Sequence, residues 1–97
     1  MNLPVILSPV ADREFVEAAA WHERQTGRGE AFIEHVQKAL DRLSRMPELH
    51  AIVYRDIRRA RVQRFPYNIF YRILVDRIEV IAVFHNKRDP KLWQSRA

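Results

Sequence analysis

Residues 11–48 read ADREFVEAAAWHERQTGRGEAFIEHVQKALDRLSRMPE, and their apolar spacing predicts two amphipathic helices joined by a short break. In the first half, small and aromatic side chains recur every three or four positions on one face: Ala11, Phe15, Ala18, Ala19 and His22. Ser8 followed by Pro9 predicts the start of this helix, with the serine as N-cap and the proline at the first helical position. The sequence TGRG at 26–29 predicts its end.

The second helix is predicted from residues 30–46, EAFIEHVQKALDRLSRM. Its apolar face carries Phe32, Val36, Leu40 and Leu43, and charged side chains occupy the opposite face. Pro47 ends this helix because proline cannot continue the helical hydrogen bonding. Two amphipathic helices with a short connection form a helical hairpin, whose apolar faces need another surface to cover them.

The remaining apolar segments predict that surface as a sheet, with strands at residues 3–7, 57–65, 67–75 and 78–85. The strand IEVIAVFH at 78–85 is apolar on both faces, as expected of a central strand that is covered on both sides. Asp76 and Arg77 are predicted to form the turn before it. The predicted fold is α+β in the order β-α-α-β-β-β, with the helical hairpin packed on a small, mainly antiparallel sheet and a short helix after Pro90.

The composition predicts a single domain over residues 1–97, since 47% of the residues are hydrophobic and 30% are charged. The chain has no cysteine, which excludes disulfides and thiolate metal sites, and its four histidines lack the spacing of metal ligands. We therefore expect no metal and no cofactor. No apolar run approaches the roughly 20 residues of a membrane helix. The N-terminus also lacks the basic segment of a signal peptide, so a cytoplasmic location is expected.

Positive charge is concentrated in the second half of the chain, where residues 51–97 carry eleven Lys/Arg and four Asp/Glu. Its densest part is RDIRRARVQR at 55–64, which contains Arg55, Arg58, Arg59, Arg61 and Arg64. Guanidinium groups bind phosphates and carboxylates through two parallel hydrogen bonds. An equally simple interpretation is an exposed edge strand whose charges prevent sheet-to-sheet association. The excess of arginine over lysine, 14 to 3, favours a binding face.

The second candidate region is VFHNKRDPKLW at 83–93, where the predicted central strand ends. His85 could transfer protons near neutral pH, Lys87 and Arg88 could hold phosphates, and Trp93 could stack on a base. Each of these side chains also has a structural interpretation, because a strand-end histidine is usually solvated and a C-terminal tryptophan usually packs. We expect Trp93 and Phe84 to anchor the tail, and Lys87 and Arg88 to stand out from it as the functional pair.

Taken together, the hairpin at 11–48, the strand FPYNIFYRI at 65–73 and the ending IEVIAVFHNKRDPKLW at 78–93 resemble the RelE/ParE superfamily of toxins from type II toxin–antitoxin systems. The ending is most similar to the ParE-like branch. The resemblance covers nearly the whole chain and implies a cognate antitoxin whose C-terminal segment wraps the toxin. RelE-like members cut messenger RNA in the ribosome, whereas ParE-like members poison DNA gyrase.

Within this resemblance, Arg88 matches the family's basic residue after the last strand. Trp93 stands near the place where the nuclease branch has a tyrosine, and Asn68 stands where that branch has an arginine. An indole N–H cannot act as a general acid or base at neutral pH. These two departures argue against RNA cleavage, although the arginine-rich strand could compensate for them.

The resemblance therefore implies a ParE-like toxin that inhibits DNA gyrase by protein–protein contact, which is not an enzymatic activity. One alternative is a ribosome-dependent mRNA endoribonuclease, for which His85, Lys87 and Arg88 are the catalytic candidates. Another is an inactive member that binds only its antitoxin. The residues expected to bind the target or nucleic acid are Arg58, Arg61, Arg64, Lys87, Arg88 and Trp93. Those expected to bind the acidic residues of the antitoxin are Arg55, Arg59, Arg61 and Arg64.

Overall fold

The helical hairpin forms as predicted in the computed structural model, which describes residues 2–97. Helix α1 spans Pro9–Thr26 and helix α2 spans Gly29–Arg45. The Ser8 hydroxyl accepts a hydrogen bond from the Ala11 N–H at 3.1 Å, which satisfies one of the free donors of the first turn. Gly27 ends α1 in the left-handed conformation, with φ of 68°, and its N–H donates to the Glu23 carbonyl.

A five-stranded sheet lies against this hairpin in the order β1-β5-β4-β3-β2. The strands are β1 (Val5–Leu7), β2 (Ile52–Tyr54), β3 (Ile57–Arg61), β4 (Tyr67–Ile73) and β5 (Ile78–His85). β1 pairs with β5 in parallel, and the other neighbours are antiparallel. The predicted α+β class and order are therefore confirmed. The strand β2 and the short helix η1 (Pro47–Leu49) before it were not predicted.

The predicted strand at 57–65 was too long, because β3 ends at Arg61. Arg64 lies in the following turn with φ of 67°, so it is not on the strand. Phe65 leaves the sheet and packs between the rings of Phe32 and His35. Strand β4 likewise ends at Ile73, before the predicted boundary, and the Leu74 N–H donates to the Arg77 carbonyl at 2.8 Å across the expected turn.

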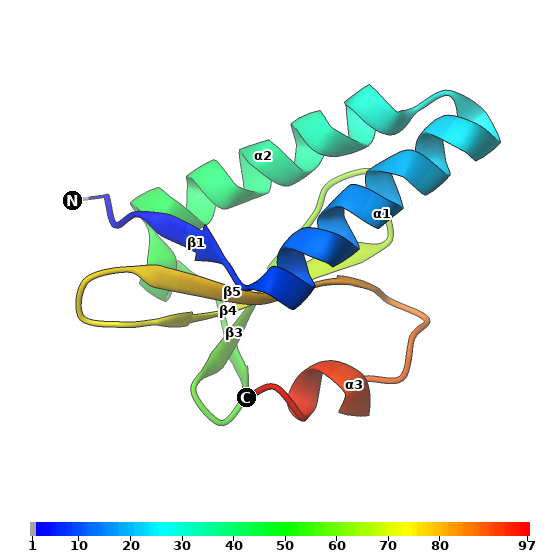
Figure 1. Ribbon diagram of the computed structural model, residues 1–97. Coiled ribbons are helices and arrows are strands. Elements are labelled where there is room, and N and C mark those ends of the chain that lie inside the picture. The colour runs from blue at the N-terminus through cyan, green and yellow to red at the C-terminus, as the bar shows by residue number, and fades with distance from the viewer. Residues whose placement is uncertain (1) are drawn as a thin grey trace.

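The sheet buries side chains on both faces. Figure 1 shows α1 and α2 covering one face, while the short helix α3 (Lys91–Gln94) lies on the other, which we call the open face. The larger core lies under the hairpin and includes Phe32, Val36, Leu43, Ile69 and Tyr71. The smaller core on the open face contains Ile57, Phe70, Ile81, Ala82, Phe84 and Trp93. Strand β5 contributes to both cores, which explains its unbroken apolar sequence.

His22 is a buried polar side chain in the larger core. Its ring stacks on Phe32 with a centroid distance of 4.8 Å and meets Tyr67 edge-on at 5.6 Å. Burial, Arg28 and His85 together lower the pKa of His22 below its ordinary value. The imidazole is therefore neutral near pH 7, and it packs as one more aromatic ring of the core.

None of the helices within residues 2–97 has the length and apolar character needed to cross a bilayer.

Candidate functional site

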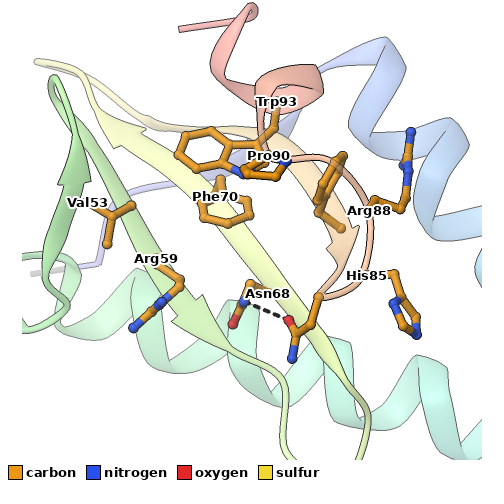
Figure 2. A pocket seen from close by; sticks show the side chains of 10 residues that line it. Val53, Arg59, Asn68, Phe70, His85, Arg88, Pro90 and Trp93 are labelled. Atoms are coloured by element: carbon orange, nitrogen blue, oxygen red, sulfur yellow. Dashed lines mark hydrogen bonds between the residues drawn. The ribbon is translucent and has the colours of Figure 1, made fainter.

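The open face carries a cavity of about 370 Å³ between the end of the sheet and the C-terminal segment. Its floor is aromatic, because the rings of Phe70 and Trp93 stack with centroids 3.9 Å apart and planes 14° from parallel. Figure 2 shows Val53 and Arg59 on one side of this cavity and His85 and Arg88 on the other. Its lining residues are Val53, Arg59, Asn68, Phe70, Phe84, His85, Asn86, Arg88, Pro90 and Trp93.

Strand register decides which arginines reach this face. Arg59 is paired with Phe70 and Arg61 with Asn68, and both partners point to the open face. Alternation along β3 therefore places the two guanidinium groups beside the cavity, where both are exposed. Arg59 lines it directly. It was predicted only as an antitoxin contact, whereas Arg61 was assigned to both target and antitoxin binding.

The other arginines of residues 55–64 point elsewhere. Arg58 turns to the helix side, where its guanidinium donates to the carbonyls of Glu48 at 3.1 Å and His50 at 2.7 Å. Arg55 lies in the β2–β3 turn with φ of 53°, and its guanidinium lies over the Tyr54 ring, 5.2 Å from the ring centroid. With Arg64 in the β3–β4 turn, the five arginines predicted on one segment do not form one surface.

The predicted functional pair at the end of β5, Lys87 and Arg88, differs in its side-chain contacts. Both residues are exposed, but the Arg88 guanidinium also pairs with Glu14 of α1 at 2.9 Å and lies 4.3 Å from the centroid of the Phe84 ring. Arg88 is thus exposed as expected, but its guanidinium is held by contacts with α1 and with Phe84. The expected anchoring by Trp93 and Phe84 is confirmed, since both are buried in the smaller core.

His85 has a defined orientation at the rim of the cavity. Its Nδ1 accepts a hydrogen bond from the Lys87 N–H at 3.0 Å, so a neutral ring carries its proton on Nε2. The ring also meets Tyr67 edge-on at 5.1 Å. It is the one imidazole among the lining residues, which include no carboxylate. The cavity can therefore hold anionic and planar groups, with His85 as its one imidazole.

Two amide side chains complete the cavity, and sequence reasoning did not select them as a site. Asn68 Nδ2 donates to Asn86 Oδ1 at 2.8 Å, as Figure 2 shows. This pairing leaves the Asn68 oxygen and the two side-chain N–H donors of Asn86 for a ligand. No spacing rule links an asparagine inside one strand with another just after the next strand, so the sequence held no signal for the pair.

The two tyrosines of β4 face the hairpin, away from the cavity. Burial raises the pKa of Tyr71 to about 12, and its hydroxyl donates to the Pro47 carbonyl at 2.6 Å. Burial also raises the pKa of Tyr67, although Arg88 acts in the opposite direction. Neither phenol ionises near neutral pH, and both rings belong to the larger core.

No cluster of three or more side chains able to hold a metal occurs between residues 2 and 97.

A family described as the ParE toxin of type II toxin–antitoxin systems, parDE, matches residues 5–90. No curated protein is significantly similar in sequence. A solved structure titled as the chromosomal ParDE system from P. aeruginosa is 11% identical, with a TM-score of 0.66, over 87% of this chain and 96% of that one. The toxin–antitoxin complex RelBE2 from Mycobacterium tuberculosis is 22% identical, with a TM-score of 0.63, over 88% and 99% of the two chains.

These two structures share the fold, and the family match covers almost every element that builds the open face. Only α3 and the residues around it lie beyond the match. The chain therefore belongs to the ParE toxin family of type II toxin–antitoxin systems.

Proposed function

We propose that this ParE-type toxin inhibits DNA gyrase by protein–protein contact through the open face, and that a cognate antitoxin neutralises it. The observation that carries the proposal is the character of the cavity, which combines Arg59 and Arg88 with stacked aromatic rings and has no carboxylate among its lining residues. Such a surface suits a partner that presents acidic and planar side chains. Aromatic and arginine side chains are also the residue types that dominate binding energy at protein interfaces.

Binding without cleavage is favoured by the groups that the cavity offers. Trp93 supplies an indole, which donates one hydrogen bond and does not exchange protons at neutral pH. Both tyrosines of β4 are buried under the hairpin. His85 alone could act as a general base, whereas cleavage through a 2′-hydroxyl also requires a group that protonates the leaving oxygen.

The test is to induce the toxin without antitoxin and to follow labelled thymidine, uridine and methionine. We expect thymidine incorporation to fail first, and purified toxin to inhibit supercoiling by gyrase in the absence of RNA. Replacing Arg59 and Arg61 together by alanine should weaken that inhibition about tenfold or more, equivalent to about 1.4 kcal/mol of lost contact energy.

Arg13→Ala is the matched control, because Arg13 is exposed on α1 and lies outside the cavity. It should inhibit as the wild type does. Early failure of methionine incorporation would instead favour the ribosome-dependent endoribonuclease, with His85, Lys87 and Arg88 as its candidates. Unchanged incorporation of all three labels would leave a member that binds only its antitoxin.

The proposed antitoxin contact lies at the β2–β3 end of the sheet. β2 is an edge strand, so its outer backbone groups can pair with an added strand, and the neighbouring Arg55, Arg59 and Arg61 are exposed. The related solved structures are titled as toxin–antitoxin systems or complexes, which supports an antitoxin partner. Because Arg61 belongs to both proposed surfaces, a bound antitoxin would exclude the target.

This contact predicts a strong dependence of antitoxin affinity on salt. Acidic residues of the antitoxin would face the arginines across water, where salt screens their attraction. We expect the dissociation constant to rise about tenfold or more between about 0.1 and about 1 M salt, as the Debye length shortens from ~10 to ~3 Å. Isothermal titration at several salt concentrations measures this directly. An affinity that does not change with salt would contradict the electrostatic part of the proposal.

A further inference from the structure

Glu14 of α1 is the meeting point of two arginines from the C-terminal segment. Its side chain is only 12% exposed. One carboxylate oxygen accepts from Arg96 Nη1 at 2.9 Å, and the other from Arg96 Nη2 at 3.0 Å and Arg88 Nη1 at 2.9 Å. Charge-assisted pairs in which two parallel bonds join one guanidinium to one carboxylate are the strongest and most directional kind.

The same carboxylate also completes the edge of β5. β1 pairs with β5 only from Ile78 to Val80, so the rest of β5 extends past its neighbour. The Val83 N–H on that edge donates to Glu14 Oε1 at 3.1 Å. A buried backbone donor without a partner would be costly, so Glu14 has a structural reason to stay in place.

Arg96 also contacts an irregularity in strand β5. Phe70 pairs with Ala82 and Tyr71 with Val80, which leaves Ile81 as an extra residue in β5. Its carbonyl accepts from Arg96 Nη1 at 3.0 Å. Arg96 is therefore held by a carboxylate from the hairpin and by a carbonyl from the bulge, and the tail is fastened at a defined point.

These contacts bracket Trp93 in the sequence, with Arg88 before it and Arg96 after it. Trp93 stacks on Phe70 and meets Tyr54 edge-on at 5.8 Å, within the apolar smaller core. Such contacts stabilise the packed ring but do not fix the path of the chain on either side of it. The ion pairs with Glu14 supply that restraint.

We propose that Glu14 is a positioning residue. It clamps residues 88–96 onto the open face and so holds Trp93 and Arg88 where they line the candidate site. The clamp joins the hairpin side of the protein to the open face through one side chain. The proposal that Glu14 holds residues 88–96 in place does not depend on the proposed function. The expected effect of this clamp on growth arrest does rest on the proposed function.

The test uses Trp93 as its own reporter. In a Trp21→Phe background Trp93 is the single tryptophan, and its exposure can be read from fluorescence quenching by acrylamide, which is uncharged and so does not respond to the arginines. Glu14→Gln keeps the shape of the side chain but turns one acceptor oxygen into a donor that faces the guanidinium groups. We expect it to increase the quenching constant at least about twofold through local opening of the tail.

Glu17→Gln is the matched control, because Glu17 lies almost one turn further along α1 and is exposed. It should leave quenching unchanged. Arg96→Lys tests the clamp from its other end, keeping the positive charge but losing the two parallel bonds. It leaves Glu14 and its hydrogen bond from the Val83 N–H in place, so it should fold even if Glu14→Gln does not, and it should increase quenching in the same direction.

Growth arrest is then measured for the same variants. Increased quenching together with weakened arrest would support both the clamp and the proposed use of the open face. Increased quenching with full arrest would support the clamp and contradict the proposed function of this face. Unchanged quenching in both Glu14→Gln and Arg96→Lys would overturn the clamp, whatever happens to growth.

Discussion

Trp93→Ala is expected to abolish growth arrest. It should also lower the free energy of unfolding by about 3 kcal/mol, which is the lower end of the cost of removing a large buried aromatic ring. The ring is 5% exposed. It is part of the smaller core and, with Phe70, part of the floor of the cavity. Its removal leaves Phe70 uncovered and opens the site to water. Urea denaturation measures the stability, and colony formation after induction measures the arrest.

Two control variants separate the loss of the site from the loss of stability. Trp93→Phe keeps a ring to stack on Phe70 and should retain most of the stability and of the arrest. Leu92→Ala removes a neighbouring side chain that is 48% exposed on the same short helix, and it should change neither property. If Trp93→Ala retained full growth arrest, the cavity on the open face would not be the site of action.

The largest loss of stability is expected for Phe32→Ala, at about 3–5 kcal/mol. Phe32 is fully buried, and its ring contacts four other rings, those of Phe15, His22, Phe65 and Tyr67, with centroid distances from 4.8 to 6.1 Å. The truncation would leave a cavity at the junction between the hairpin and the sheet. Natural domains have a total stability of about 5–15 kcal/mol, so a large part of it would be lost.

Ile33→Ala is the adjacent control for this variant. Ile33 is 41% exposed on the outer side of the same helix, and its truncation should cost less than about 1 kcal/mol. Both variants should unfold in a single transition under urea, with the midpoint of Phe32→Ala strongly lowered. Equal losses in the two variants would show that the hairpin does not pack on the sheet through Phe32.

The two substitutions remove side chains from different cores, so they are expected to affect growth arrest in different ways. Phe32 belongs to the core under the hairpin, whereas Trp93 belongs to the smaller core on the open face. A variant of the larger core should lose growth arrest only through unfolding. A variant of the smaller core should lose it while most of the protein is still folded, because the proposed target surface is assembled on that side.

Much of the architecture was predictable from local pattern. Three features depend only on residues close together in the sequence. They are the helical periodicity of residues 11–48, the helix start at Ser8-Pro9 and the apolar run of β5. The strand β2 escaped prediction because it has only three residues, and its edge position leaves Ile52 and Val53 exposed. The limits of β3 and β4 were missed because their turns contain no glycine to mark them.

The sequence by itself determined the fold class, the hairpin and the basic character of the second half, since these follow from periodicity and charge count. Tertiary structure alone decided how that charge is used. Register and turn geometry sent Arg59 and Arg61 to the open face, Arg58 to the helix side and Arg64 into a turn. The contact of Glu14 with Arg96 spans 82 positions of chain, and no local rule relates residues so far apart. Only the packing of α1 against the free edge of β5 brings them together.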